Sequence, residues 1–177
     1  PVRRRQDFIS AAEEQALLAE LEPLLSAKAY EPAHWDAAIA QYRELQRARF
    51  GPAARPALRR CVAQLRMHHA SHQQPHQELR LLPVHVLDLA AAGCIRPHVD
   101  SSSASGALLA GLSLLSDAVL ELAETDGPAR LAALLPRRSL YVLAPAARYA
   151  FAHAIPPAPA QRFRGRPIDR QRRVSLM

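Results

Sequence analysis

Cysteine and long apolar runs are scarce in this sequence, and each shortage excludes a class of protein. The two cysteines, Cys61 and Cys94, are too few for a disulfide-stabilised scaffold and favour a reducing compartment. No stretch approaches the roughly 18 consecutive apolar residues of a membrane-spanning helix, so no membrane span is expected. The 177 residues are enough for one domain with a real core.

Aromatic residues make up 5% of the chain and are absent between Phe50 and Tyr141. Enzymes that act on a nucleobase extrude it and stack it between aromatic side chains. This shortage therefore counts against the repair of bases in duplex DNA. It does not exclude RNA, because a formal charge of +7 is compatible with nucleic acid, with an anionic membrane or with a mitochondrial address.

Two helical patterns come first, and strand-like patterns follow. The first helix is expected to begin at a capping box, Ser10 to Glu13, and to end or kink at Pro23. A second amphipathic helix is expected over residues 55–67. The aromatic residues clustered around 30–50 favour a second core layer, with a lid over a site as the alternative.

From residue 81 onward, short strands separated by turns predict a double-sheet jelly roll. Within it we expect a turn at Gly93, a bulge at Gly111, and a short helix or strand over 130–135. The whole chain is expected to be one domain, with a helical N-terminal flank over about 1–70 and a jelly-roll core over 81–177. Because it starts without methionine and stops inside a strand-like run, we expect a fragment that lacks both natural ends.

His98 and Asp100 are two residues apart, so an extended segment presents both side chains on one face. A histidine and a carboxylate are two thirds of the 2-His-1-carboxylate site of non-haem Fe(II) oxygenases. His153, in an alternating segment, could supply the third ligand. Taken alone, the pattern also fits a strand end with two solvated polar residues. The order of the motifs, with a basic strand at 172–177 after both histidines, favours the metal site.

These motifs resemble the AlkB-like Fe(II)/2-oxoglutarate dioxygenases, and in particular a mitochondrial branch of that family. The matching segments are residues 30–31, 34–39, 85–89, 93–100, 110–115, 139–143, 147–149 and 172–175. The resemblance therefore covers nearly the whole chain. It implies a mainly β fold with flanking α-helices and a double-stranded β-helix (jelly roll) core. The metal-binding motif and the late histidine would lie at the same open end.

The resemblance also implies the occupants of the site, Fe(II) and the cosubstrate 2-oxoglutarate. The implied metal ligands are His98, Asp100 and His153, and the implied cosubstrate-binding residues are Tyr141, Arg173, Val174 and Ser175. Arg173 would pair with the distal carboxylate, because a planar guanidinium suits a bidentate contact.

Two positions depart from the family pattern. The family's second arginine, six positions after the first, would fall beyond Met177. Leu87 stands where the nucleobase-repairing members place an asparagine, so one polar contact to the cosubstrate is expected to be absent.

The resemblance implies an enzyme of the mitochondrial matrix that consumes 2-oxoglutarate and O2. Its favoured function is protein hydroxylation, linked to programmed necrosis after alkylation damage and to fatty-acid and energy metabolism. The short polar segment 70–83, where repair enzymes carry a nucleotide lid, favours a bulky substrate such as a protein side chain. An RNA (tRNA) demethylase is one alternative. A non-catalytic jelly-roll interaction module is the other.

Overall fold

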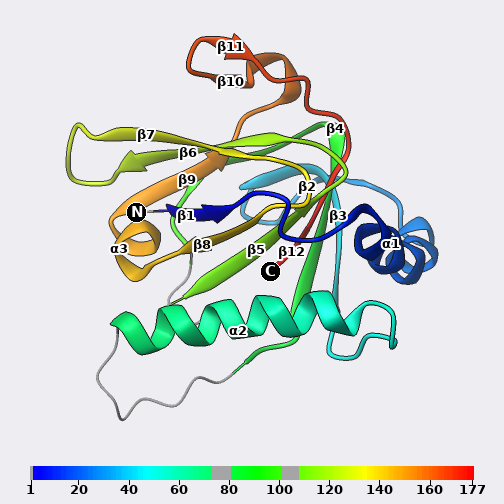
Figure 1. The fold of residues 1–177 in the computed structure, drawn as a ribbon. Helices are drawn as coiled ribbons and strands as arrows, with labels where there is room; N and C mark the ends of the chain where they lie inside the picture. Colours follow the sequence, from blue (N-terminus) through cyan, green and yellow to red (C-terminus); the bar gives the residue numbers. More distant parts are fainter. Residues whose placement is uncertain (1, 73–80, 101–107) are drawn as a thin grey trace.

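The computed structural model describes residues 2–72, 81–100 and 108–177, and its strands outnumber its helices (Figure 1). In chain order the elements are β1 (Val2–Arg5), α1 (Ala11–Ser26), β2 (Glu31–Ala33), β3 (Ile39–Arg47), α2 (Arg55–His72), β4 (Val84–His98), β5 (Leu109–Leu114), β6 (Ala118–Glu124), β7 (Arg130–Leu135), β8 (Leu140–Leu143), α3 (Pro145–Tyr149), β9 (Phe151–Ile155), the 3-10 helix η1 (Ala158–Ala160), β10 (Arg162–Phe163), β11 (Arg166–Pro167) and β12 (Arg173–Leu176).

One antiparallel sheet of ten strands forms the body of the molecule, in the order β1-β8-β5-β12-β4-β9-β6-β7 with β2 and β3 attached beside β4. The first half of β4 pairs with β12, and its last residues pair with β9. The long strand β4 therefore passes from one half of the curled sheet to the other. This is the jelly roll expected from the sequence, and the prediction of the fold class is confirmed.

Alternate residues of the central strands face two different cores. On β4, Val86 belongs to the core beneath α1 and α2, and its neighbour Leu87 belongs to the core inside the curled sheet. On β8, Leu140 and Tyr141 divide in the same way. Each fully buried apolar side chain contributes roughly 1.5–3 kcal/mol relative to exposure. The period-two pattern of the strands thus stabilises both sides of one sheet.

Helix α1 begins where the sequence predicts. The Ser10 hydroxyl accepts a hydrogen bond from the Glu13 amide at 3.2 Å, and the Ser10 amide donates to the Glu13 carboxylate at 2.9 Å. The helix does not end at Pro23, as one of the two expectations had it, because α1 continues to Ser26. Buried leucines one turn apart, including Leu25 after the proline, hold the helix on the sheet and outweigh the local defect.

The N-terminal flank contains strands as well as helices, which the sequence interpretation missed. Strand β1 pairs with β8, and β3 pairs with β4 along most of its length. Edge strands have little alternation to reveal them, because their side chains are mostly half-exposed or exposed here. Residues 130–135, left open as helix or strand, form β7.

The turn expected at Gly93 and the bulge expected at Gly111 are both wrong. Gly93 lies inside β4, where a Cβ atom would approach the Gln41 carbonyl oxygen to 2.5 Å. The buried Arg170 donates to backbone carbonyls of this irregular segment, at 3.1 Å for Ala90 and 3.0 Å for Ala91. Gly111 pairs in regular register with Tyr141 and is no bulge.

None of the described helices is long and apolar enough to cross a lipid bilayer.

Candidate metal and cosubstrate site

The two histidines of the predicted site are brought together by strand pairing. His98, the last residue of β4, lies directly opposite His153 of β9 in the antiparallel register. Their ring centroids are 4.4 Å apart. Opposite residues of an antiparallel pair project to the same face, so this register aims both imidazoles at one point. Asp100 follows two residues after β4 ends.

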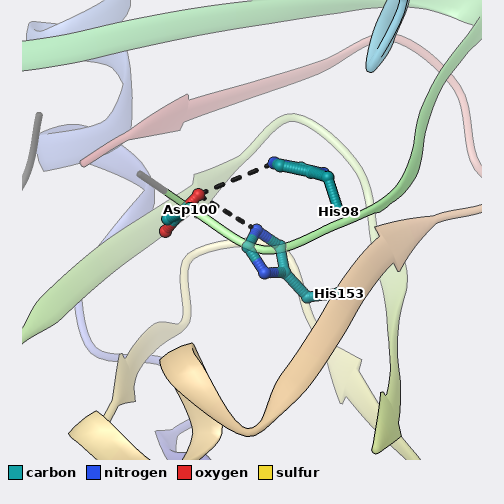
Figure 2. A group of neighbouring side chains, drawn as sticks. All are labelled: His98, Asp100 and His153. Atoms are coloured by element: carbon teal, nitrogen blue, oxygen red, sulfur yellow. Dashed lines mark ion pairs between the residues drawn. The ribbon is translucent and has the colours of Figure 1, made fainter. Parts of the chain in front are cut away.

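Asp100 faces both imidazoles through one oxygen atom (Figure 2). Its Oδ1 is 3.6 Å from His98 Nε2 and 3.4 Å from His153 Nε2. One nitrogen or oxygen atom from each of the three residues lies within 4.8 Å of the others. Two nitrogens and one carboxylate oxygen at this spacing fit a divalent transition metal, and the set matches the ligands of non-haem Fe(II) enzymes.

Hydrogen bonding fixes the tautomer that a metal ligand requires. His98 Nδ1 lies 2.9 Å from the backbone carbonyl oxygen of Arg96. A carbonyl only accepts hydrogen bonds, so Nδ1 of the neutral ring carries the proton and Nε2 keeps its lone pair toward Asp100. This part of the site is therefore oriented by the backbone of β4 itself.

The charges of the site also suit a cation. The contact with His98, followed by the charges of His153 and Arg148, holds the Asp100 pKa at about 2, so this carboxylate is ionised. Burial lowers the pKa of His153 to about 4, which keeps its ring neutral. The neighbouring Asp100 carboxylate raises the pKa of His98. The ionised Asp100 oxygen beside the neutral imidazole of His153 provides donors of the type that bind divalent iron.

Arg148 is a site residue that the sequence interpretation missed. Its side chain is fully buried, and its guanidinium lies 3.1 Å from Asp100 Oδ2 through Nη2 and 3.3 Å through Nε. Helix α3, which carries it, was not predicted. A lone arginine in an apolar stretch has no spacing that marks it, although residues 147–149 are among the segments that match the family.

Arg173 supplies the second half of the site, because its guanidinium is buried with an unused donor. The residue is 2% exposed, and its Nε donates to Ser113 Oγ at 2.9 Å. Among the described residues, Arg173 Nη2 and Ser175 Oγ have no hydrogen-bond partner. A buried guanidinium rarely leaves an N–H unpaired, so this atom marks a place for an acceptor such as a carboxylate.

One cavity joins Arg173 to the histidine–aspartate cluster. Its walls include the three clustered residues together with Tyr141, Arg173 and Ser175. Gly111 leaves room for the Tyr141 ring, since a Cβ atom there would lie 2.1 Å from the Tyr141 Cζ atom. Tyr141 therefore lines the same cavity as Arg173 and the cluster.

Val174 does not line this cavity, which corrects one expected cosubstrate contact. The residue is fully buried in the core beneath α1, on the opposite face of β12 from Arg173 and Ser175. Alternation along the strand forces this outcome, because three successive residues cannot all face one side. Leu87 does line the cavity, where the sequence pattern places it.

Solved structures of low sequence identity share this fold. OsALKBH1 covers 99% of this chain and 95% of its own, with 12% identity and a TM-score of 0.66. A Pseudomonas putida prolyl-4-hydroxylase gives 17% identity and 0.62, covering 99% of this chain and 89% of its own. A Trichoplax adhaerens prolyl hydroxylase solved with a peptide gives 11% and 0.67, covering 99% and 81%. The fold is that of the jelly-roll 2-oxoglutarate oxygenases.

Sequence relatives narrow this class to a family. The chain is 45% identical over 174 residues to the Bos taurus protein named alpha-ketoglutarate-dependent dioxygenase alkB homolog 7, mitochondrial, covering 98% of this chain and 75% of that protein. The Mus musculus protein of the same name is 42% identical, with 96% and 74% covered. No protein-family model matches the chain. The chain belongs to the alkB homolog 7 family of 2-oxoglutarate-dependent dioxygenases.

Membership of this family confirms several expectations from the sequence. The protein is a dioxygenase enzyme for which the family implies 2-oxoglutarate (alpha-ketoglutarate) as cosubstrate, O2 as co-reactant and, typically, Fe(II) as the metal. The mitochondrial relatives support a mitochondrial location by resemblance. The names of these relatives specify the cosubstrate and not the molecule that is oxidised.

Proposed function

We propose that this protein hydroxylates a protein side chain in mitochondria. In this proposal, Fe(II) is bound by His98, Asp100 and His153, and 2-oxoglutarate is bound by Tyr141, Arg173 and Ser175. The observation that carries it is the unused N–H of buried Arg173, which lies in the same cavity as a metal-type cluster.

The chain's own residues bind, orient and shield the reactants. When bound, iron and 2-oxoglutarate supply the oxidation, in which one oxygen atom of O2 enters the substrate and the other enters succinate, with release of CO2. Arg173 offers its unpartnered N–H to the distal carboxylate, and Ser113 holds the guanidinium by accepting from Nε. The apolar cavity residues Leu120 and Ile155 keep water from the reacting centre.

The shape and composition of the site support a protein substrate. No Phe, Tyr or Trp occurs between Phe50 and Tyr141, so this region offers no aromatic surface for a flipped base. The cavity walls are mainly aliphatic around the site. The link to programmed necrosis after alkylation damage and to fatty-acid and energy metabolism remains a prediction from the resemblance.

RNA demethylation is the second candidate, and one observation favours it. Trp35, in the turn between β2 and β3, is 89% exposed, and its neighbour His34 lines the cavity. An exposed indole beside an oxidising site could stack on an unpaired base. Replacing Trp35 with alanine separates the two candidates, because stacking on a base would be lost whereas hydroxylation of an aliphatic side chain would change less.

The test is the conversion of 2-oxoglutarate to succinate by the full-length, iron-loaded protein, with His98→Ala as control. We expect succinate from the wild type and none from the control. Adding mitochondrial protein extract should increase turnover more than adding total tRNA. A larger increase with tRNA would replace the protein hydroxylase with the demethylase. Bound iron without succinate would replace both with the non-catalytic interaction module.

A further inference from the structure

The two carboxylate oxygens of Asp100 have different partners. Oδ1 faces Nε2 of His98 and of His153, at 3.6 and 3.4 Å, which is too long for a strong hydrogen bond and leaves space between the three atoms (Figure 2). Oδ2 instead lies 3.1 Å from Nη2 of Arg148. The carboxylate is thus divided between a metal-binding side and an arginine side.

Arg148 reaches Asp100 from the short helix α3. It lies in α3, between β8, which carries Tyr141, and β9, which carries His153. Its amide donates to the Ala144 carbonyl at 3.1 Å, and its guanidinium carbon lies 5.3 Å from the ring centroid of Tyr149. The side chain is fully buried. A buried guanidinium needs a nearby anion, and Asp100 provides one.

We propose that Arg148 is a positioning residue that makes Asp100 a ligand through one oxygen only. Its guanidinium holds Oδ2, so a metal ion between the histidines meets Oδ1 alone. A carboxylate that bound through both oxygens would occupy one more position on the metal. A 2-His-1-carboxylate site must keep three positions open, two for the cosubstrate and one for O2. This inference rests on the proposed metal site.

The inference predicts defects in metal affinity and in the metal's spectroscopic environment. Outer-shell partners of metal ligands typically change affinity by about 10–100-fold when they are lost. We expect Arg148→Gln to weaken Mn(II) binding by this factor, since the amide cannot supply the charged, two-pronged contact. Arg148→Lys keeps the charge but not the planar fork, so it should recover part of the affinity.

The experiment is an anaerobic titration of the full-length protein with Mn(II), followed by electron paramagnetic resonance. Absorbance of the Fe(II)–2-oxoglutarate complex provides a second readout, and thermal unfolding in EDTA monitors the fold. Arg43→Gln is the matched control, because Arg43 also pairs with a buried aspartate of β4, Asp88, at 2.7 Å, outside the metal cluster. It should lower stability and leave both metal signals unchanged.

The outcomes separate this inference from the proposed function. Folded Arg148→Gln with the wild-type Mn(II) affinity and spectrum would overturn the positioning role and leave the metal site intact. Wild-type protein that binds Mn(II) no better than His98→Ala would refute the metal site itself. If Arg148→Gln does not fold, Arg148→Lys decides, because it keeps the buried charge. A lysine variant with unchanged affinity and unchanged absorbance would also overturn the role.

Discussion

Two neighbouring arginines at the start of β12, one just before the strand and one as its first residue, show how this sheet separates a structural ion pair from a binding group. Arg172 donates to Asp88 at 2.9 and 2.7 Å and to Glu22 at 2.8 and 3.2 Å. Among the described residues, Arg173 makes one side-chain hydrogen bond, to Ser113, and its Nη2 has no partner. The two residues have the same chemistry, and their partners alone distinguish Arg172 as a structural residue from Arg173 as a ligand-binding residue.

The same contrast holds for two aspartates of the β4 region. The Asp88 cluster consists of Asp88 with Tyr30, Arg43, Arg172 and Glu22. Asp88 is fully buried, and its two oxygens accept from Tyr30 at 3.1 Å, from Arg43 at 2.7 Å and twice from Arg172. A carboxylate offers about four acceptor sites, so nothing further can bind there. Asp100 has one oxygen engaged by Arg148 and one aimed at a space.

The largest effect expected is on stability, from Asp88→Asn. The substitution keeps the shape and removes the carboxylate that accepts from the partly buried guanidinium groups of Arg43 and Arg172, and each charge-assisted hydrogen bond lost costs about 1.5–3 kcal/mol. Urea unfolding should show this loss. Mn(II) affinity of the molecules that remain folded should be unchanged. A variant as stable as the wild type would mean that the Asp88 cluster is not structural. The contrast between Asp88 and Asp100 would then be wrong for Asp88.

His98→Ala should give the opposite result, with metal binding lost and the fold retained. Removing a direct ligand should weaken Mn(II) binding by more than about 100-fold, beyond the range typical of outer-shell groups. In EDTA, the unfolding free energy should change by less than about 1 kcal/mol, because His98 is only half-buried. Isothermal titration and chemical unfolding provide the two readouts. Retained metal affinity would remove His98 from the site.

The paired substitutions Arg173→Lys and Arg172→Lys test the two arginines directly. Loss of a charge-assisted hydrogen bond costs about 1.5–3 kcal/mol, so Arg173→Lys should weaken 2-oxoglutarate binding by roughly 10–100-fold. Arg172→Lys should lower stability and leave 2-oxoglutarate affinity unchanged. The measurement is a 2-oxoglutarate titration of the Mn(II) complex. Equal effects of the two lysines on cosubstrate affinity would contradict the division of roles.

Gly111→Ala tests the support of the site by its neighbouring strand. The new methyl group would meet the Tyr141 ring, and overpacking of this kind costs about 1–3 kcal/mol. We expect a moderate loss of stability together with weaker 2-oxoglutarate binding, because the ring must move within the cavity. Tyr141→Phe serves as the control, since it keeps the packing and removes the hydroxyl. A stable Gly111→Ala variant with unchanged cosubstrate affinity would show that Tyr141 does not contact the cosubstrate.

The sequence predicted the elements whose patterns are strong and local. The capping box at Ser10 placed α1, and the spacing of His98 and Asp100 placed the metal cluster. The resemblance to a family selected His153 and Arg173 from many histidines and arginines. Strands β1 to β3 escaped prediction because their side chains are mostly half-exposed or exposed and give no clear alternation.

The remaining site features depend on contacts between distant residues. Arg148 meets Asp100 across 48 residues, and Arg173 meets Ser113 across 60. No local pattern encodes such pairs, since they arise only when the sheet curls. Val174 was misassigned because adjacency to Arg173 was given more weight than the alternation of a strand. Gly111 was read as a bulge although its role is to make space for a ring.

The smallest effect expected concerns Glu13, at the N-terminus of the helix that also carries Glu22 of the Asp88 cluster. The hydrogen bond from Arg60, followed by the one from the Ser10 amide, lowers the Glu13 pKa to about 2, below its ordinary value of 4.5. The folded state therefore binds fewer protons than the unfolded state between these values. The stabilisation is complete above about pH 4.5 and is lost as the pH falls toward 2.

Glu13→Gln should therefore be less stable than the wild type by about 1 kcal/mol at pH 7, the typical value of a helix cap with an exposed ion pair. The difference should shrink steadily below pH 4.5. Urea unfolding at pH 7 and pH 3 measures it, with Mn(II) affinity at pH 7 as the control that should not change. A difference that is the same at both pH values would mean that the Glu13 charge contributes nothing. If Mn(II) affinity fell as well, the contacts of α1 would affect the metal site. The division between structural and ligand-binding residues, seen at Arg172 and Arg173, would then not hold for α1.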